Sequence, residues 1–299
     1  PDSTGRIECD LRTLPMRVYC IAPESQAARM PQPKAVVSQF GPHVKEVAIQ
    51  GNVAVLSTLN WDNNLYGVNT ETGELLWRDR VGQYFAFGPQ AAGEGFAVQS
   101  FDFTSAHGYH LHLLGRDGKS TRRFALPGLP QRLPHEFISG ALLQDRTNQF
   151  AVSPRGDWIV AEGSLGITAW DHEGKRLWNE DGAHIPPSSQ GLLTALNAET
   201  VIRTRGVSVL AHDPRTGAQR WQLDLASSGD IVRVAPSADG RTLIVLTTTE
   251  SGRLFVIRDG KVINTISAKG DEVAVSPDGA YVAITDVEKL KLYDSTRGM

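Results

Sequence analysis

Several features common in chains of this length are scarce or missing from this 299-residue sequence. Apolar runs are short, with Leu243–Leu246 a typical example, whereas a bilayer-spanning helix needs roughly 18–20 apolar residues. Lys and Arg form no dense run, and the formal net charge is only -3. Binding to phosphate backbones needs a concentrated positive field. The sequence therefore predicts neither a transmembrane segment nor a nucleic-acid-binding surface.

Cysteine is also scarce, with Cys9 and Cys20 as the two copies. They form no CxxC or CxxCH motif, so thioredoxin-like chemistry and covalent haem attachment have no support. Their separation would permit a small disulfide-closed loop, which would indicate an oxidising compartment. The chain begins at Pro1 without a leader, as expected if an export signal has been removed or the chain has been trimmed. We expect a Cys9–Cys20 disulfide and a periplasmic or extracellular location, with two free thiols in the cytoplasm as the alternative.

A repeat of about 43 residues organises most of the chain. Each copy has an acidic or amide residue, a short turn that ends in glycine, and then an apolar or aromatic residue. The copies are Asn69–Gly73, Asp117–Gly118, Asp171–Gly174, Asp213–Gly217, Asp259–Gly260 and Asp294–Gly298. Gly174, Gly217 and Gly260 are 43 residues apart. Such a period indicates a stack of similar structural units.

Short apolar runs lie between these turns. The first unit has four of them: Val47–Ile49, Val53–Leu56, Leu65–Val68 and Leu75–Trp77. Short strands without helical periodicity indicate an all-β fold, and four strands per repeat of this length is typical of a propeller. We predict a single β-propeller of about six four-stranded blades, with seven if residues 1–33 add strands of their own.

The two ends of the chain are predicted to meet in one blade. The last repeat supplies three strands and no fourth, whereas Lys34–Phe40 has strand composition and precedes the first full unit. An N-terminal strand that completes the C-terminal blade would remove exposed sheet edges. The predicted organisation is an N-terminal extension, residues 1–33, followed by a β-propeller domain, residues 34–299.

Two motifs carry a family resemblance. Gly67–Trp77 reads Gly-x-Asn-x-x-Thr-Gly-x-x-x-Trp, and Ala211–Trp221 reads Ala-x-Asp-x-x-Thr-Gly-x-x-x-Trp. Both resemble the tryptophan-docking motif of quinoprotein-like propellers, and the turn Ser276–Gly279 resembles those of WD40-like and YVTN-like propellers. The resemblance covers roughly residues 34–299 and implies the fold, but such scaffolds host many unrelated activities.

The same resemblance raises the question of a quinone cofactor. Quinoprotein dehydrogenases are larger, eight-bladed rings with a calcium or lanthanide site and often an adjacent pair of cysteines. This chain is too short, and its cysteines are not adjacent. We therefore predict no cofactor.

The side of the propeller expected to bind a partner follows from strand order. With strands a to d in each blade, the a–b and c–d turns are short, and the irregular b–c and d–a links leave from the opposite side. Long loops on a rigid scaffold are where binding usually resides, and aromatic residues anchor many interfaces. The predicted partner-binding residues are Trp61, Asp62, Asn63, Asn64, Phe101, Asp102, His107, His135, Glu136, Phe137 and His184.

A histidine cluster and scattered carboxylates were weighed as metal sites. His110 and His112 would share one face of a strand, with His107 or Asp102 as a conceivable third ligand, but we favour a polar outer strand surface with Leu111 and Leu113 facing the core. A metal-dependent lactonase would need Asp62, Asn64, Asp102 and Glu162 to converge at the central channel. We predict no metal ligands and no catalytic residues.

The expected function is that of a non-catalytic scaffold that binds a protein partner, as a subunit or assembly partner in a larger complex. A calcium- or zinc-dependent lactonase-type hydrolase, with its site at the channel mouth, is the alternative.

Overall fold

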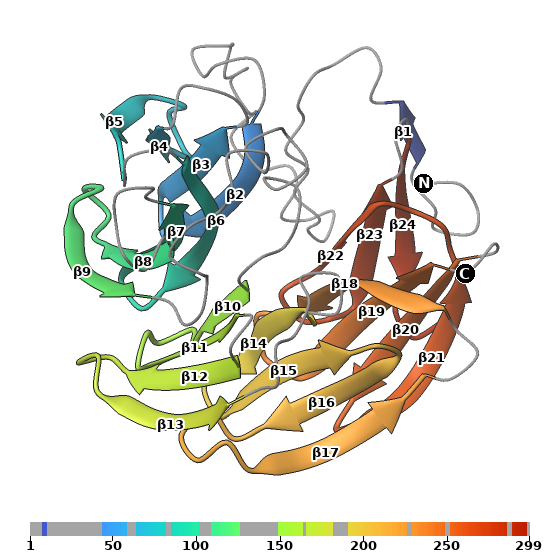
Figure 1. Cartoon of the computed structure of the whole chain (residues 1–299). Helices are drawn as coiled ribbons and strands as arrows, with labels where there is room; N and C mark the ends of the chain where they lie inside the picture. Colours follow the sequence, from blue (N-terminus) through green and yellow to red (C-terminus); the bar gives the residue numbers. More distant parts are fainter. Residues whose placement is uncertain are drawn as a thin grey trace, which may run out of the picture. The chain divides into compact units, whose positions relative to one another are not determined.

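The computed structural model describes eleven stretches of the chain (Figure 1). They are residues 8–10, 44–58, 64–81, 85–101, 109–125, 149–163, 166–181, 191–225, 229–248, 252–285 and 289–297. Every regular element in these stretches is a β-strand. No helix able to cross a bilayer is found in them.

The strands form six four-stranded antiparallel sheets, the blades of a β-propeller. Contacts divide the chain into two units, one of Pro31–Gln190 and one of Pro1–Met30 with Gly191–Met299. The predicted all-β fold with six four-stranded blades is confirmed. Within each unit the first strands of neighbouring blades contact one another, as β2 contacts β6 and β18 contacts β22.

The first unit contains blades 1 to 3. Blade 1 is β2 (Val44–Gln50), β3 (Val53–Thr58), β4 (Leu65–Asn69) and β5 (Leu75–Asp79). Blade 2 is β6 (Phe85–Ala92), β7 (Gly95–Phe101), β8 (Tyr109–Leu114) and β9 (Ser120–Ala125). Blade 3 is β10 (Gln149–Val152), β11 (Trp158–Gly163), β12 (Gly166–Asp171) and β13 (Arg176–Asp181).

The second unit contains blades 4 to 6. Blade 4 is β14 (Leu193–Asn197), β15 (Thr200–Arg205), β16 (Ser208–His212) and β17 (Gln219–Asp224). Blade 5 is β18 (Asp230–Pro236), β19 (Thr242–Thr248), β20 (Arg253–Arg258) and β21 (Lys261–Ser267). Blade 6 is β22 (Glu272–Val275), β23 (Tyr281–Thr285), β24 (Lys289–Asp294) and β1 (Glu8–Asp10).

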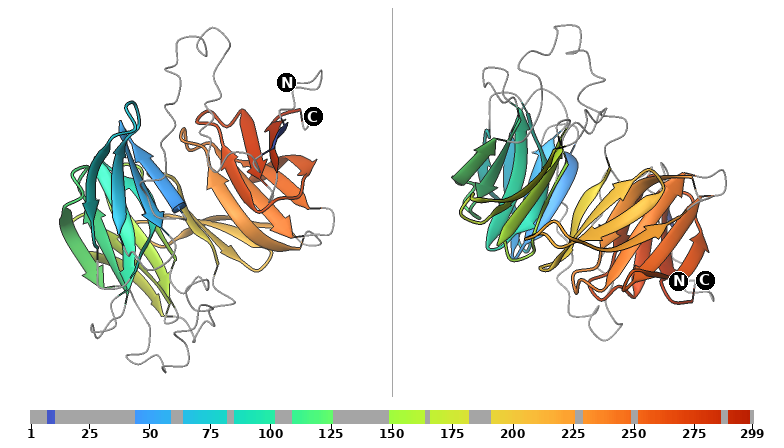
Figure 2. Two further views of the ribbon diagram at one scale, coloured as in Figure 1. Left: turned by 90° about the horizontal axis from the view of Figure 1, so that it is seen from above. Right: turned by 60° about the horizontal axis from the view of Figure 1, so that its bottom comes forward.

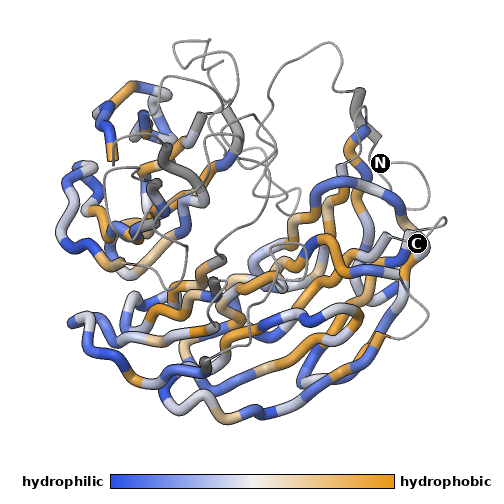
Figure 3. Tube along the Cα trace, in the orientation of Figure 1, coloured by the Kyte–Doolittle hydropathy of each residue, from blue (hydrophilic) through white to orange (hydrophobic). Residues whose placement is uncertain are grey.

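The core lies between adjacent blades and is formed mainly by the second and third strands of each. β19 is buried at six consecutive positions, because Leu, Ile and Val cover both of its faces. Fourth strands such as β9 and β17 are mostly polar and exposed. In Figure 3 the hydrophobic segments accordingly lie in the inner strands of blades 4 and 5, while β17 is largely hydrophilic.

Hydrogen bonds between turns join consecutive blades within each unit. Each joins the a–b turns of neighbouring blades: Gln50 donates its side-chain amide to the carbonyl of Gly93, and the N–H of Gly93 donates to the carbonyl of Pro154 at 3.3 Å. In the second unit, Asn197 Nδ2 donates to the carbonyl of Gly240 at 3.1 Å. The N–H of Asp239 donates to the carbonyl of Pro277 at 3.0 Å. The turns therefore hold the blades of each unit in register. Figure 2 shows the strands of these sheets from two further sides.

The sixth blade confirms that an N-terminal strand completes the C-terminal sheet, but the predicted segment was wrong. β1 pairs with β24, whereas Lys34–Phe40 lies outside the described residues. The register sets Glu8 opposite Lys291 and Asp10 opposite Lys289. Because β1 occupies the free edge of β24, no other segment can pair there. The segment 1–33, predicted as an extension, thus contributes a strand to a blade.

Candidate functional site

Most of the predicted partner-binding residues lie outside the described part of the chain. Asn64 directly precedes β4 and is half-buried, and Phe101 is the last residue of β7. The others are Trp61, Asp62, Asn63, Asp102, His107, His135, Glu136, Phe137 and His184. Cys20 lies outside as well, so the disulfide with Cys9 of β1 stays a prediction. The role of the eleven predicted residues in partner binding likewise stays a prediction.

The strand ends support the predicted difference between the two sets of connections only in part. The a–b and c–d turns within described blades span two to six residues, and the connection from β9 to β10 runs from residue 126 to 148, but the b–c links of blades 3 and 4 have only two residues each. Apart from Val47 in the middle of β2, the large hydrophobic side chains that are exposed in the described stretches lie within three residues of an a–b or c–d turn. The exposed side chains are those of Val47, Ile49, Leu75, Leu76, Val262, Ile263 and Tyr281.

His110 and His112 share one face of β8, as predicted, but that face is buried rather than an outer polar surface. Both side chains are nearly inaccessible, and their ring centroids lie 6.5 Å apart. Ser100 Oγ lies 2.8 Å from His112 Nε2, and Arg123 Nη2 lies 3.0 Å from His110 Nε2. Burial, followed by the charges of Arg123 and His110, lowers the pKa of His112 to about 4. His112 is therefore neutral at pH 7, and both histidines are buried, hydrogen-bonded side chains of the blade 1–2 interface.

Nothing in the described stretches supports the lactonase alternative. They hold no group of three or more His, Cys, Asp or Glu side chains that could bind a metal ion. Glu162 is buried on β11, the second strand of blade 3, rather than on the innermost strand. Asp62 and Asp102 lie outside the described residues.

The first tryptophan motif forms a tight contact between blades 1 and 2. Trp77 Nε1 donates to the backbone carbonyl of Arg116 at 2.7 Å. The indole lies against two glycines: a Cβ on Gly67 would stand 2.1 Å from Trp77 Cε2, and one on Gly118 would stand 2.6 Å from Cδ2. Both distances are shorter than any real Cβ contact, so only glycine at these positions allows the ring to lie so close.

The second motif, in blade 4, stacks its tryptophan less closely. Trp221 lies against Gly260 of blade 5, where a Cβ would stand 3.0 Å from Trp221 Cδ2. Ala211 is paired with Trp221 where Gly67 is paired with Trp77. Since the methyl group of Ala211 occupies the space over the strand, the indole of Trp221 cannot settle there as the indole of Trp77 does. Trp221 Nε1 has no hydrogen-bond acceptor in the described stretches.

The c–d turn of the following blade differs as well. β8 and β9 are joined by five residues, Gly115–Lys119, and the second of them supplies the carbonyl that Trp77 meets. β20 and β21 are joined by Asp259 and Gly260 alone. Their φ values of 48° and 70° are those of a type I′ hairpin turn, which Asp-Gly favours. The shorter turn has no counterpart of Arg116, so no carbonyl from it reaches Trp221.

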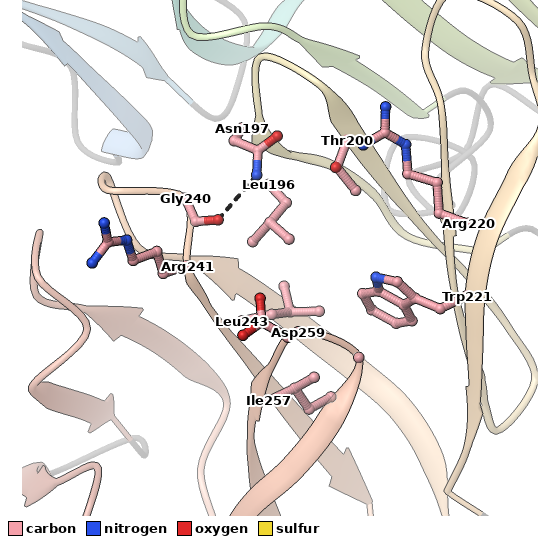
Figure 4. A pocket seen from close by; sticks show the side chains of 11 residues that line it. Leu196, Asn197, Thr200, Arg220, Trp221, Gly240, Arg241, Leu243, Ile257 and Asp259 are labelled. Carbon is pink, nitrogen blue, oxygen red and sulfur yellow. Dashed lines mark hydrogen bonds between the residues drawn. The ribbon is translucent and has the colours of Figure 1, made fainter.

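A pocket of about 300 Å³ lies between blades 4 and 5, beside the indole of Trp221 (Figure 4). Leu196, Leu243 and Ile257 form its apolar wall, and Trp221 closes one side. Its polar lining consists of Asn197, Thr200, Arg220, Arg241 and Asp259. All of these residues belong to blades 4 and 5, at the side of the short turns.

One ion pair lies at this pocket. Arg220 Nη2 lies 2.8 Å from Asp213 Oδ2. Although burial raises it, hydrogen bonds from Arg220 and from two backbone amides lower the pKa of Asp213 overall. Among the other polar groups of the lining, the Trp221 N–H, the Thr200 hydroxyl, the Arg241 guanidinium and the Asp259 carboxylate make no hydrogen bond to a described residue.

Sequence reasoning did not identify this pocket, although its signals were present. The motifs at Gly67–Trp77 and Ala211–Trp221 differ at their first position, and the following turns differ in length. Both differences determine how the indole is seated. The convergence of Asn197, Arg220 and Arg241 depends on neighbouring blades, which no local pattern shows.

Blades joined through tryptophan-docking contacts define a quinoprotein-like β-propeller. The model of the PQQ_2 family, described as "Outer membrane protein assembly factor BamB", matches residues 130–289, which is more than half of the chain. The chain belongs to this family. No curated protein matches the sequence.

Solved structures resemble the chain in fold. The β-propeller domain of Cps50 (Swd1) from Myceliophteria thermophila is 14% identical, with a TM-score of 0.57, and the match covers 84% of this chain and 83% of that one. It is one of 1450 similar chains, so this likeness identifies a widespread fold and carries no function with it.

Proposed function

We propose that this chain is a non-catalytic binding scaffold, a subunit or assembly partner that engages another protein through its b–c and d–a links. The observation that supports the proposal most directly is the hydrogen bonding between consecutive a–b turns, which makes each set of blades a rigid base. Links anchored on a rigid base keep their ends fixed before a partner binds, and this lowers the ordering cost of association.

Membership in a family described by an outer-membrane assembly factor fits this role. We accordingly propose that the protein works in the periplasm or at the outer membrane, within a protein assembly. An export route is also compatible with the predicted Cys9–Cys20 disulfide.

The proposal is tested by site-specific photo-crosslinking in the native cell. A photoreactive residue is placed at Trp61, Phe101 or Phe137, and at Thr72 or Thr216 in the c–d turns as matched controls. We expect one partner protein to be crosslinked from the first three positions and not from the controls. Crosslinks from Thr72 and Thr216 alone would assign binding to the other side of the blades.

A second variant tests whether the longest link contributes. Residues 127–147 are replaced by a short Gly-Ser linker, with the thermal unfolding of the variant as the check on folding. Loss of the crosslinked partner with unchanged unfolding is the expected result, and an undiminished yield of crosslink would remove this link from the binding surface.

A further inference from the structure

The pocket between blades 4 and 5 has the polarity of a site for a peptide. From its geometry we infer that it binds an extended peptide segment of a partner protein, which places a backbone carbonyl on the Trp221 N–H and an apolar side chain against Leu243 and Ile257. This inference concerns the short-turn side of the second unit, and it does not rest on the function proposed for the b–c and d–a links.

The first step is the contrast between two equivalent tryptophans. In blade 1 the indole N–H is satisfied by a backbone carbonyl, that of Arg116 at 2.7 Å. In blade 4 the N–H of Trp221 meets no acceptor in the described stretches, and the indole lines the pocket instead (Figure 4). The chain itself thus shows which chemical group suits this donor, namely a peptide carbonyl.

The second step is the charge balance. Arg220 is paired with Asp213, and the two remaining charged side chains of the lining, Arg241 and Asp259, have opposite signs. Asn197 is committed to the carbonyl of Gly240. A ligand with a net negative charge would meet the Asp259 carboxylate, and a simple cation would meet the arginines. A neutral peptide offers an acceptor for Trp221 and an N–H donor for Asp259 within one unit.

The third step is size and apolar content. A pocket of about 300 Å³ is at the lower end of the range for small-ligand sites and holds one side chain with its adjoining peptide groups. Its wall of leucine and isoleucine suits a branched apolar side chain. Val262 and Ile263, exposed by 38% and 46%, lie at the start of β21, after the Asp259–Gly260 turn and Lys261.

The experiment uses the whole chain, with its six tryptophans labelled at the indole nitrogen. N-acetyl-leucine N-methylamide, a single residue with both peptide groups, is titrated while the indole N–H resonances are followed by NMR. We expect the Trp221 resonance to shift with a Kd of about 1 mM, as for a ligand of this size, and the Trp77 resonance to stay in place. Sodium acetate, which carries charge without a peptide group, should shift neither.

Three variants distinguish binding of the peptide at this pocket from nonspecific apolar binding. Trp221→Phe keeps the ring and removes the donor, so binding followed on Leu243 and Ile257 methyl resonances should weaken about fivefold. Asp259→Asn keeps a residue suited to the turn and should weaken binding about threefold. Replacing Asp259–Gly260 with the five residues of the blade 2 turn, Gly-Arg-Asp-Gly-Lys, should fill the pocket from within and weaken binding more than tenfold.

Several results would overturn the inference. They are an unmoved Trp221 resonance at the highest soluble concentration of the capped leucine, an equal response to acetate, and unchanged affinity in both Trp221→Phe and Asp259→Asn. The two point variants leave the strands intact, so the inference remains open to refutation even where the turn replacement does not fold.

Discussion

The two tryptophan motifs show how one sequence pattern produces two different blade contacts. In blade 1 the ring is sealed between glycines and its N–H is satisfied within the chain. In blade 4 the equivalent ring, that of Trp221, lies beside an open pocket, because Ala211 replaces the glycine and the following turn in blade 5 has only two residues. The repeat therefore maintains the fold while small departures from it create a place for another molecule.

The largest effect on stability is expected when a substitution displaces the Trp77 indole from its place between blades 1 and 2. In Gly67→Ala the new methyl group would stand 2.1 Å from Trp77 Cε2, so the ring must leave its seat and lose its bond to Arg116. We expect the free energy of unfolding, measured in urea, to fall by about 3 kcal/mol. The reciprocal Ala211→Gly should cost about 1 kcal/mol, the ordinary price of glycine in a strand. Equal losses in the two variants would contradict the contrast between the contacts.

The next prediction concerns how the free energy of unfolding depends on pH through His112, at the interface of blades 1 and 2. His112 on β8 is paired with Val98, and at the corresponding place in blade 5 Phe255 is paired with Val245. Because the pKa of His112 falls from 6.5 to about 4 on folding, the unfolded chain binds more protons between these values. Stability present above pH 6.5 is thus lost as the pH falls toward 4, by about 3 kcal/mol.

Urea unfolding at intervals between pH 7 and pH 4 measures this loss. The variant His112→Phe, which copies blade 5, should have a flatter profile over that range. A slope identical to that of the wild type would show that another group is responsible. Carboxylates such as Asp278 and Asp294, whose pKa values are lowered mainly by hydroxyl hydrogen bonds, contribute only below their usual range.

Removing each indole N–H in turn isolates the hydrogen bond. Trp77→Phe deletes the donor to the Arg116 carbonyl and should cost about 1 kcal/mol more than Trp221→Phe. The two substitutions remove the same atoms from the same strand position, although the closer packing of Trp77 against its glycines adds to the difference. A difference near zero would mean that the Arg116 contact adds nothing to stability.

The smallest effect is expected where blades 5 and 6 are joined by charge. Arg233 meets the Glu272 carboxylate through two nitrogens, at 2.8 and 2.6 Å, but the pair is partly exposed. Arg233→Met keeps most of the apolar stem and should lower the free energy of unfolding by about 0.5 kcal/mol. Addition of 1 M salt should reduce the difference between variant and wild type.

Much of the fold could be predicted because its determinants are local. Asp-Gly and Pro-Asp-Gly turns impose their geometry within four residues, and apolar runs such as Val53–Leu56 identify the buried strands. The partner of β24 could not be found in this way, because any extended segment satisfies an edge. A count of repeat spacing cannot show which extended segment takes that edge.

The candidate pocket was harder to predict for a related reason. Its residues come from two blades and from both kinds of short turn, so they are brought together only by packing. His110 and His112 were also predicted only in part. Their spacing correctly predicted that they share one face of a strand, but the burial of that face depends on packing against the neighbouring blade.

The pairing of β1 with β24 also governs when the protein can finish folding. During synthesis the stretch around Glu8 leaves the ribosome long before Lys291 is made, and domains generally fold as the chain emerges. The sixth sheet cannot be completed until β24 has been made, so β1 stays without its partner until then. A truncated product, having lost that partner, would carry an unmatched strand for chaperones or proteases to recognise.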